Sequence, residues 1–425
     1  MENNMKFIKT PVKGMNDMLP EDMRLRERVL ALIKDNYARY GFSQIETPCM
    51  EHIENLTGKQ GGENEKLIFK VMKRGAELER AMEKEDGELA DFGMRYDLTV
   101  PLSRYYANHS AELPSPFKAL QIGNVWRADR PQKGRFRQFM QCDIDILGDD
   151  SALAEIELLT ATASTLTRIF AEAGISRFTL HVNDRRILRA MAAYAGFAEE
   201  SFDSVFIELD KMDKIGADGV RESLLALGFA EESVNTYLAL FDGSTDSVRD
   251  FCQKIVEDGK LAPDVLDSFE TILACARPNI AEDVTVMFDP TLVRGMSYYT
   301  GTIFEITLDD YHFSVAGGGR YDEMIGKFSG QRVAACGFSI GFERIITILK
   351  DVLTENARHT DTQKTAFLLE NGIPRAKMQE IFARADALRR DGKTVTVQPL
   401  KKNAKFQIDR LEAEGYTQIE RFYRD

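Results

Sequence analysis

Cysteine and histidine are scarce in this chain, and their spacing excludes most metal sites and disulfide frameworks. Only 5 cysteines and 5 histidines occur among 425 residues. No two cysteines form a CxxC pair and no histidines stand at HExxH spacing, so no zinc site is predicted. An odd number of isolated cysteines also argues against a disulfide framework. We expect reduced thiols that mainly contribute to packing.

Long apolar runs are absent as well. No run approaches the roughly 20 residues that a membrane helix needs, and residues 1–11 contain no apolar core of a signal peptide. We therefore expect no membrane segment and a cytoplasmic location. The hydrophobic fraction of 44% and the charged fraction of 29% are typical of a globular protein. The length exceeds that of one ordinary core, so two or three domains are expected.

Positive charge is in deficit, and several nucleotide-binding motifs are missing. The net charge of −13 weighs against non-specific binding of nucleic acid. There is no Walker A motif, no GxGxxG after a first strand and no GxSxG, so P-loop, dinucleotide-binding and hydrolase functions lose their main support. The local exception is a cluster of five basic residues, Arg127, Arg130, Lys133, Arg135 and Arg137.

Apolar periodicity and breakers predict a mixed domain followed by a smaller unit. Residues 184–280 show only helical patterns, which indicates a helical insertion within a sheet domain of residues 1–350. A polar linker is expected at 351–364, and a small α/β unit at 365–425. The expected helices are 20–40, 153–173, 376–390 and 403–414. The expected strands are 44–48, 117–122, 139–147, 178–182, 284–288, 302–308, 365–370, 394–398 and 419–422, with loops at 56–66 and 127–134 and a surface excursion at 75–91.

The strand expected at 139–147 has one apolar and one polar face. Side chains alternate along a strand, which places Gln141, Asp143 and Asp145 together on the face opposite Cys142 and Ile144. The apolar face must cover a core. The polar face then lies either in a pocket or in solvent, and the alternation fits both.

Four further segments suggest ligand binding. Arginines such as Arg127, beside a strand, suit a bidentate grip on phosphate, and several cations together suit a triphosphate with magnesium. A basic surface hairpin is the alternative. Asp97 and Thr99 share a face of an extended segment and suit an ammonium group, or Asp97 caps the helix that follows.

The densest of these segments covers residues 292–301 and 316–322. It combines Arg294, Tyr298 and Tyr299 with the glycines 317–319. Glycines permit close backbone approach, although a tight hairpin uses them as well. Arg344 follows two glycines at the start of a helix, which is again suited to phosphate. This mixture suggests a site for a small aromatic or polar ligand together with a phosphate.

In this order the segments resemble the histidyl-tRNA synthetases, a family of class II aminoacyl-tRNA synthetases. Residues 20–48 resemble motif 1 of the class, 126–139 motif 2 and 337–344 motif 3, and residues 292–305 and 316–322 resemble the two histidine signatures. The resemblance implies an α+β fold, with an antiparallel sheet flanked by helices. It also implies ATP, Mg²⁺, L-histidine and histidine tRNA as cofactors and substrates, and a homodimer built on motif 1.

The resemblance also assigns roles to single residues. Arg127 would bind the α-phosphate and Arg344 the γ-phosphate of ATP, with Arg135 near the adenylate. Arg294 would stabilise charge opposite a metal, which makes Arg127 and Arg294 the expected catalytic pair. The expected histidine-binding residues are Asp97, Leu98, Thr99, Arg127, Gln141, Asp145, Arg294, Tyr298 and Tyr299, with Asp145 and Tyr299 at the imidazole.

Two features depart from the family pattern. The family usually has Asp at the position of Ser297. The unit at 365–425 resembles the family's anticodon-binding domain but is shorter, which leaves anticodon contact open. The alternative functions are a regulatory subunit of ATP phosphoribosyltransferase, which shares this catalytic fold and charges no tRNA, and a non-catalytic tRNA-binding protein.

Overall fold

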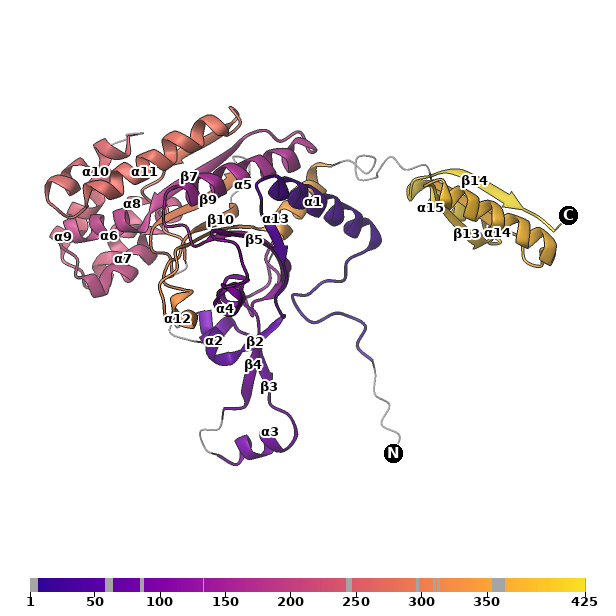
Figure 1. Ribbon diagram of the computed structural model, residues 1–425, viewed down its shortest axis with the longest axis horizontal. Coiled ribbons are helices and arrows are strands. Elements are labelled where there is room, and N and C mark those ends of the chain that lie inside the picture. The colour runs from indigo at the N-terminus through magenta and orange to yellow at the C-terminus, as the bar shows by residue number, and fades with distance from the viewer. Residues whose placement is uncertain are drawn as a thin grey trace. The chain divides into compact units, whose positions relative to one another are not determined.

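The computed structural model describes residues 7–57, 64–84, 88–132, 134–241, 247–295, 298–308, 311, 314–353 and 364–424. The chain divides into two compact units, Met1–Val352 and Leu353–Asp425. Each unit has its own central sheet with helices packed against it (Figure 1).

An eight-stranded sheet organises the first unit, in the order β1-β5-β6-β11-β10-β9-β7-β8. Neighbouring strands are antiparallel through the centre, from β5 to β7, and a parallel pair lies at each edge, β1 with β5 and β7 with β8. This confirms the α+β expectation. The strands are β1 (Ser43–Ile45), β5 (Phe117–Trp126), β6 (Gln138–Leu147), β7 (Phe178–Asp184), β8 (Val284–Phe288), β9 (Thr302–Leu308), β10 (Ser314–Arg320) and β11 (Ala335–Ile340).

Two long helices form a layer on this sheet, with α5 (Leu153–Ala171) against the strands and α1 (Pro20–Arg39) against α5. Helix α1 begins with a proline and two acidic residues in its first turn, which favour a helix start. Its buried stripe of Leu25, Val29, Ile33 and Tyr37 packs on α5. Helix α5 also packs on β6, β11 and helix α11 (Pro263–Ala276), so most of its sides are covered. That position explains why α5 is so apolar.

The helical pattern expected at 184–280 is confirmed, and it belongs to the same compact unit as the sheet. Gly196 and Gly228 end helices with positive φ, as their positions in the sequence suggested, whereas Gly243 lies outside the described residues. The helices are α6 (Arg185–Tyr194), α7 (Phe202–Leu209), α8 (Met212–Ala226), α9 (Glu231–Leu238), α10 (Val248–Glu257) and α11 (Pro263–Ala276).

The excursion after β1 contains more structure than expected. A second sheet of order β2-β4-β3 forms there, and the loop predicted at 56–66 is interrupted by a 3-10 turn, η1 (Asn64–Leu67). Residues 58–63 and 85–87 lie outside the described part. The elements are β2 (Met50–His52), α2 (Ile53–Thr57), β3 (Lys70–Met72), α3 (Gly75–Met82), β4 (Ala90–Met94) and α4 (Thr99–His109).

The glycines at 317–319 lie inside the central strand β10, so the hairpin alternative is wrong. A β-carbon on Gly318 would lie 2.0 Å from the carbonyl oxygen of Gly337 on β11. Glycine is needed here because the two backbones approach so closely. Two helices complete the first unit, α12 (Gly326–Ser329) and α13 (Phe342–Val352).

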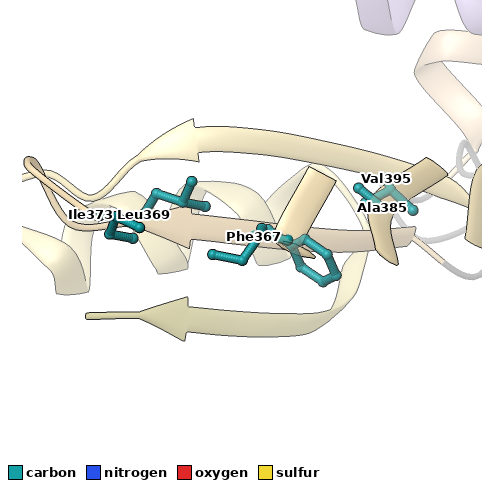
Figure 2. Packing of buried hydrophobic residues seen from close by; sticks show 6 residues of the cluster. Phe367, Leu369, Ile373, Ala385 and Val395 are labelled. Carbon is teal, nitrogen blue, oxygen red and sulfur yellow. The ribbon is translucent and has the colours of Figure 1, made fainter. Parts of the chain in front are cut away.

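The second unit is a three-stranded parallel sheet of order β13-β12-β14 with two helices. Its core holds Phe367, Leu369, Ile373, Ala385 and Val395 (Figure 2). The elements match the predicted pattern to within a few residues. They are β12 (Lys364–Leu369), α14 (Arg375–Arg390), β13 (Thr394–Pro399), α15 (Ala404–Ala413) and β14 (Tyr416–Phe422).

Several strands are longer than predicted. Strand β5 continues to Trp126, beyond the predicted end at 122, and β7 continues to Asp184. Both extensions carry polar residues such as Asn124 and Asn183. Backbone pairing of β5 with β6, and of β7 with β9, keeps these residues extended. Their own strand propensity would not predict this.

Candidate active site

The polar face of β6 forms part of the wall of a cavity of about 1090 Å³. Asp143 and Asp145 line this cavity and are only 5% and 3% exposed. The solvent alternative for this face is therefore wrong. On the opposite face Cys142 and Ile144 are fully buried, as the alternation predicted.

Directly paired residues on six successive strands form a line across the sheet beneath this cavity, and most of them have polar side chains. Neighbouring strands place these residues directly opposite one another, so residues far apart in the sequence meet on one face. The line runs through Gln121, Asp143, Ser339, Gly317, Glu305 and His181, on β5, β6, β11, β10, β9 and β7.

Asp145 offers a buried acceptor to this cavity. Its Oδ1 accepts a hydrogen bond from the hydroxyl of Tyr321 at 2.6 Å, while Oδ2 is buried without a partner among the described residues. Burial raises the pKa of Asp145 to about 7, although the bond from Tyr321 opposes the shift. A β-carbon on Gly337 would lie 2.0 Å from Oδ1. Glycine at 337 therefore makes the room that this carboxyl group occupies.

Asp97 caps a helix and also lies on the cavity wall. Its Oδ1 accepts from the backbone N–H of Val100 at 3.0 Å, which caps the first turn of α4, and the residue also lines the cavity. Burial raises its pKa, and the bond from Val100 and the charge of Arg127 oppose this. Thr99 lines the cavity too. Leu98 is absent from the cavity wall: its side chain is buried in the core, 1% exposed.

Arg127 is held rigidly at the other side of the cavity. Its Nε donates to the carbonyl of Tyr96 at 3.1 Å. The guanidinium lies 4.2 Å from the ring centroid of Tyr96 and 5.2 Å from that of Phe139. A guanidinium stacked between aromatic faces keeps one orientation, which suits a bidentate contact with an anion.

Arg294 adopts a backbone conformation that is unusual for a side chain other than glycine. Its φ of 61° lies in the left-handed region, where strain is tolerated mainly at functional sites. The guanidinium forms an ion pair with Glu305, and its Nε is buried without a partner in the described structure. A β-carbon on Gly317 would come within 2.4 Å of this guanidinium. Glycine at 317 therefore makes room for Arg294.

The two tyrosines after Arg294 wall the cavity. Tyr298 packs edge-on against Tyr299 at 4.8 Å and against Tyr321 at 6.0 Å between ring centroids. Burial raises the pKa of both Tyr298 and Tyr299, and the charge of Arg294 opposes this for Tyr299. Met296 and Ser297 lie outside the described residues, as does Lys133.

Arg344 and Arg135 complete a cationic group on the cavity. Arg344 Nη1 contacts the Oγ of Ser314 at 3.2 Å. Burial lowers the pKa of Arg344, and the nearby charges of Arg135, Arg294 and Arg127 add to this, while Glu305 opposes it. Like charges gathered in this way repel one another, and an anion relieves the repulsion.

A buried ion pair fixes the start of α13 below this group. Arg26 on α1 donates to both carboxylate oxygens of Glu343, at 2.6 and 2.8 Å. Glu343 also accepts from the backbone N–H of Met140 on β6 at 3.2 Å. The expected motif 1 helix is thus connected to the turn that presents Arg344.

Every residue expected at the site except Leu98 lines this one cavity. The sequence placed Asp143 on the polar face of its strand without giving it a role. It missed Glu305, Tyr321 and Ser339, although all three lie within the segments that it singled out as signatures or motifs. Their contacts depend on β11 and β9, which no local pattern reveals.

The described part of the chain contains neither a cluster of metal ligands nor a helix able to span a membrane. No group of three or more His, Cys, Asp or Glu side chains stands close enough there to hold a metal ion. None of the helices in the described ranges has the length and apolar character that a membrane crossing requires.

Comparison with known proteins identifies the family. Residues 14–345 match the family model for histidyl-tRNA synthetase. The chain is 43% identical over 419 residues to the histidine–tRNA ligase of Leifsonia xyli subsp. xyli, covering 96% of this chain and 94% of that one. It is 38% identical to the histidine–tRNA ligase of Bacteroides fragilis (strain YCH46) over 352 residues, covering 80% of this chain and 76% of that one.

Solved structures similar to this chain include members of the same family. Histidyl-tRNA synthetase from Nostoc sp. PCC 7120 matches with a TM-score of 0.76 and 26% identity, covering 96% of this chain and 90% of that one. A Bacillus halodurans protein described as an ATP phosphoribosyltransferase regulatory subunit/histidyl-tRNA synthetase matches with a TM-score of 0.75, 21% identity and 99% coverage of both chains, a likeness of fold alone. The chain therefore belongs to the histidyl-tRNA synthetase family and has the fold of a class II aminoacyl-tRNA synthetase.

Proposed function

We propose that this protein activates L-histidine with ATP and transfers the histidyl group to histidine tRNA. One observation carries the proposal: a single cavity joins buried carboxyl groups, including Asp97 and Asp145, to a group of arginines. Carboxyl groups suit a ligand with an ammonium group and a ring N–H. Arginines suit a polyphosphate. Histidine and ATP together have both features.

Asp145 would recognise the imidazole ring through its unpartnered Oδ2. The other oxygen of Asp145, Oδ1, is already occupied by the hydroxyl of Tyr321, and Tyr299, which also lines the cavity, would face the imidazole together with Asp145. Tyr299 also interacts with Arg294. Selectivity follows because an apolar side chain in place of imidazole would leave the buried carboxyl group unpaired, which is costly.

Asp97, Thr99 and Gln141 would receive the ammonium group of histidine. All three line the cavity, and the Oε1 of Gln141 is a buried acceptor without a partner in the described structure. An ammonium group has three N–H donors, which matches three oxygen acceptors. The α-carboxylate would then point toward Arg127.

In the first step an oxygen of the histidine carboxylate attacks the α-phosphorus of ATP. A P–O bond forms, the bond to the leaving pyrophosphate breaks, and no side chain needs to take a proton. Arg127 would hold the α-phosphate, Arg294 would stabilise its developing charge, Arg344 would bind the γ-phosphate and Arg135 would lie near the adenylate. Catalysis of this kind is positioning together with charge stabilisation. In the second step a ribose hydroxyl oxygen of the terminal adenosine of the tRNA attacks the carbonyl carbon of the adenylate. The bond from that carbon to the phosphate oxygen breaks, AMP leaves, and the hydroxyl proton passes to the phosphate or to solvent.

Mg²⁺ would enter with ATP. The described residues form no metal cage of their own, but Mg²⁺ in nucleotide sites commonly binds through one or two carboxylates and the substrate phosphates. Glu305, beside Arg294 on the cavity wall, is a carboxylate of this kind. When bound, the ion neutralises phosphate charge.

We further propose that residues 1–350 are the catalytic domain, with a helical insertion at 184–280. Residues 351–364 would be a linker and residues 365–425 an anticodon-binding-like domain that contacts the tRNA. A homodimer would form on the motif 1 segment. Exposed apolar side chains lie within and on either side of this segment, Met23 at 38%, Leu19 at 67% and Met50 at 53%, which fits burial at a subunit interface.

Two assays on the purified protein test the proposal. Histidine-dependent exchange between ATP and pyrophosphate measures adenylate formation, and attachment of labelled histidine to histidine tRNA measures charging. Both are expected. Exchange without charging would indicate an adenylate-forming paralogue, and failure of both would favour the regulatory function.

A further inference from the structure

A chain of hydrogen bonds links Gln141 to Asp143 through Ser339. The Nε2 of Gln141 donates to the Oγ of Ser339 at 2.9 Å, and the hydroxyl of Ser339 donates to Oδ1 of Asp143. Ser339 on β11 stands directly opposite Asp143 on β6. All three side chains line the cavity. Neither Asp143 nor Ser339 has a role in the function proposed above.

The single proton of a hydroxyl group gives this chain a direction. Because Ser339 donates its proton to Asp143, its oxygen can only accept from Gln141. The amide nitrogen of Gln141 is therefore turned toward Ser339, and its Oε1 is turned away. This Oε1 is buried and without a partner in the described structure. An oriented acceptor is thus available on the cavity wall before any ligand binds.

We propose that Asp143 and Ser339 are positioning residues that fix the direction of the Gln141 amide, so that its oxygen receives the ammonium group of the amino-acid substrate. This inference rests on the proposed binding of histidine in the cavity. Without the two residues the amide could turn, and its NH₂ group would then oppose the ammonium group.

The protonation state of Asp143 controls this direction. Burial raises the pKa of Asp143 well above its usual range, and the charges of Asp145 and Asp97 raise it further. The bond from Ser339 and the charge of Arg127 oppose the shift. A protonated Asp143 can donate to Ser339, which then donates to the Oε1 of Gln141 and leaves the NH₂ group facing the cavity.

Binding of the ammonium group therefore favours ionised Asp143, because only a protonated carboxyl group can donate to Ser339 and reverse the chain. Where Asp143 carries a proton in the free protein, histidine binding favours loss of that proton to solvent. Histidine affinity should accordingly fall as the pH is lowered, with Asp143 contributing part of the proton release.

Ser339→Ala tests the positioning role, and Thr307→Val is its matched control. Thr307 also presents a hydroxyl group to the cavity, but it bonds to His181 at 2.9 Å instead of to Gln141. For Ser339→Ala we expect the dissociation constant of histidine, measured by calorimetry, to rise about tenfold, since a misdirected buried polar group costs about that much. The KM for ATP and the melting temperature should stay within error, and Thr307→Val should leave histidine affinity unchanged.

Three results would overturn the inference. Histidine affinity of Ser339→Ala within twofold of the parent would show that no direction was being set. A parallel loss of ATP affinity or of melting temperature would indicate a structural role. Failure of the parent to bind histidine would refute the proposed function itself, which is a distinguishable outcome.

Asp143→Asn provides a second, independent measurement that does not depend on Ser339→Ala folding. Calorimetry of histidine binding in two buffers with different heats of ionisation counts the protons released. We expect fewer protons released by Asp143→Asn than by the parent at the same pH. Equal proton counts in the two proteins would exclude Asp143 as the group that ionises.

Discussion

Replacing Asp145 by Asn should make the protein more stable while removing its affinity for histidine. Asp145 is 3% exposed, and its Oδ2 has no partner in the described structure. Asn has nearly the same shape, and its carbonyl oxygen can still accept from the hydroxyl of Tyr321. The substitution therefore removes mainly a buried charge.

The size of the gain follows from the pKa of Asp145. Folding raises it from 3.8 to about 7, first because of burial. The folded state then binds more protons than the unfolded state between these values, so this group destabilises the fold increasingly as pH rises. One pKa unit corresponds to about 1.4 kcal/mol, so the cost is about 4 kcal/mol at pH 8 and about 2 kcal/mol at pH 5.

Thermal unfolding at several pH values measures this difference. With an unfolding entropy of roughly 2.1 cal/mol/K per residue, a unit of about 350 residues gains roughly 6 °C at pH 8 and roughly 2 °C at pH 5. Asp150→Asn removes an exposed charge and controls for the change in net charge. A gain that does not change between pH 5 and 8 would refute the reasoning, as would a loss of stability at pH 8.

The histidine affinity of Asp145→Asn should move in the opposite direction. Asn keeps one acceptor toward Tyr321 but presents an NH₂ group where Oδ2 was. We expect the dissociation constant of histidine to rise at least thirtyfold, which corresponds to about 2 kcal/mol, with little change for ATP. Equal losses for both ligands would contradict a role in imidazole recognition.

Three other outcomes are expected. Arg294→Ala should abolish histidine-dependent exchange of ATP and pyrophosphate without loss of the fold, and exchange near the parent rate would refute its role. Gly317→Ala should slow exchange on the order of a hundredfold, because its methyl group would displace the Arg294 guanidinium. An unchanged rate would show that the position of this guanidinium against residue 317 does not affect catalysis. Sedimentation at micromolar concentration should show a dimer, and a monomer would contradict the proposed interface.

Local patterns predicted most of the secondary structure because side-chain periodicity is a local property. The alternation in β6 separated Cys142 and Ile144 from Gln141 and Asp145, and both faces are as predicted. Strand ends were predicted less well. β5 and β7 run on through polar residues because cross-strand partners hold them there.

The candidate site was predicted to the extent that its residues belong to separate recognisable motifs. Arg127, Arg294 and Arg344 come from three of them, and they share one cavity. Leu98, expected among the histidine-binding residues, does not line the cavity, although its neighbours Asp97 and Thr99 do. At the point where α4 begins, Leu98 turns its side chain into the core.

The sequence by itself determined the family, the order of the motifs and the kinds of chemical group at the site. Only the tertiary structure decided that the polar face of β6 is buried, that Tyr321 contacts Asp145, and that Ser339 links Gln141 to Asp143. The reason is the sheet order. Strand β11, which comes late in the chain, lies between β6 and β10, and such a long-range pairing leaves no periodic signal in either strand.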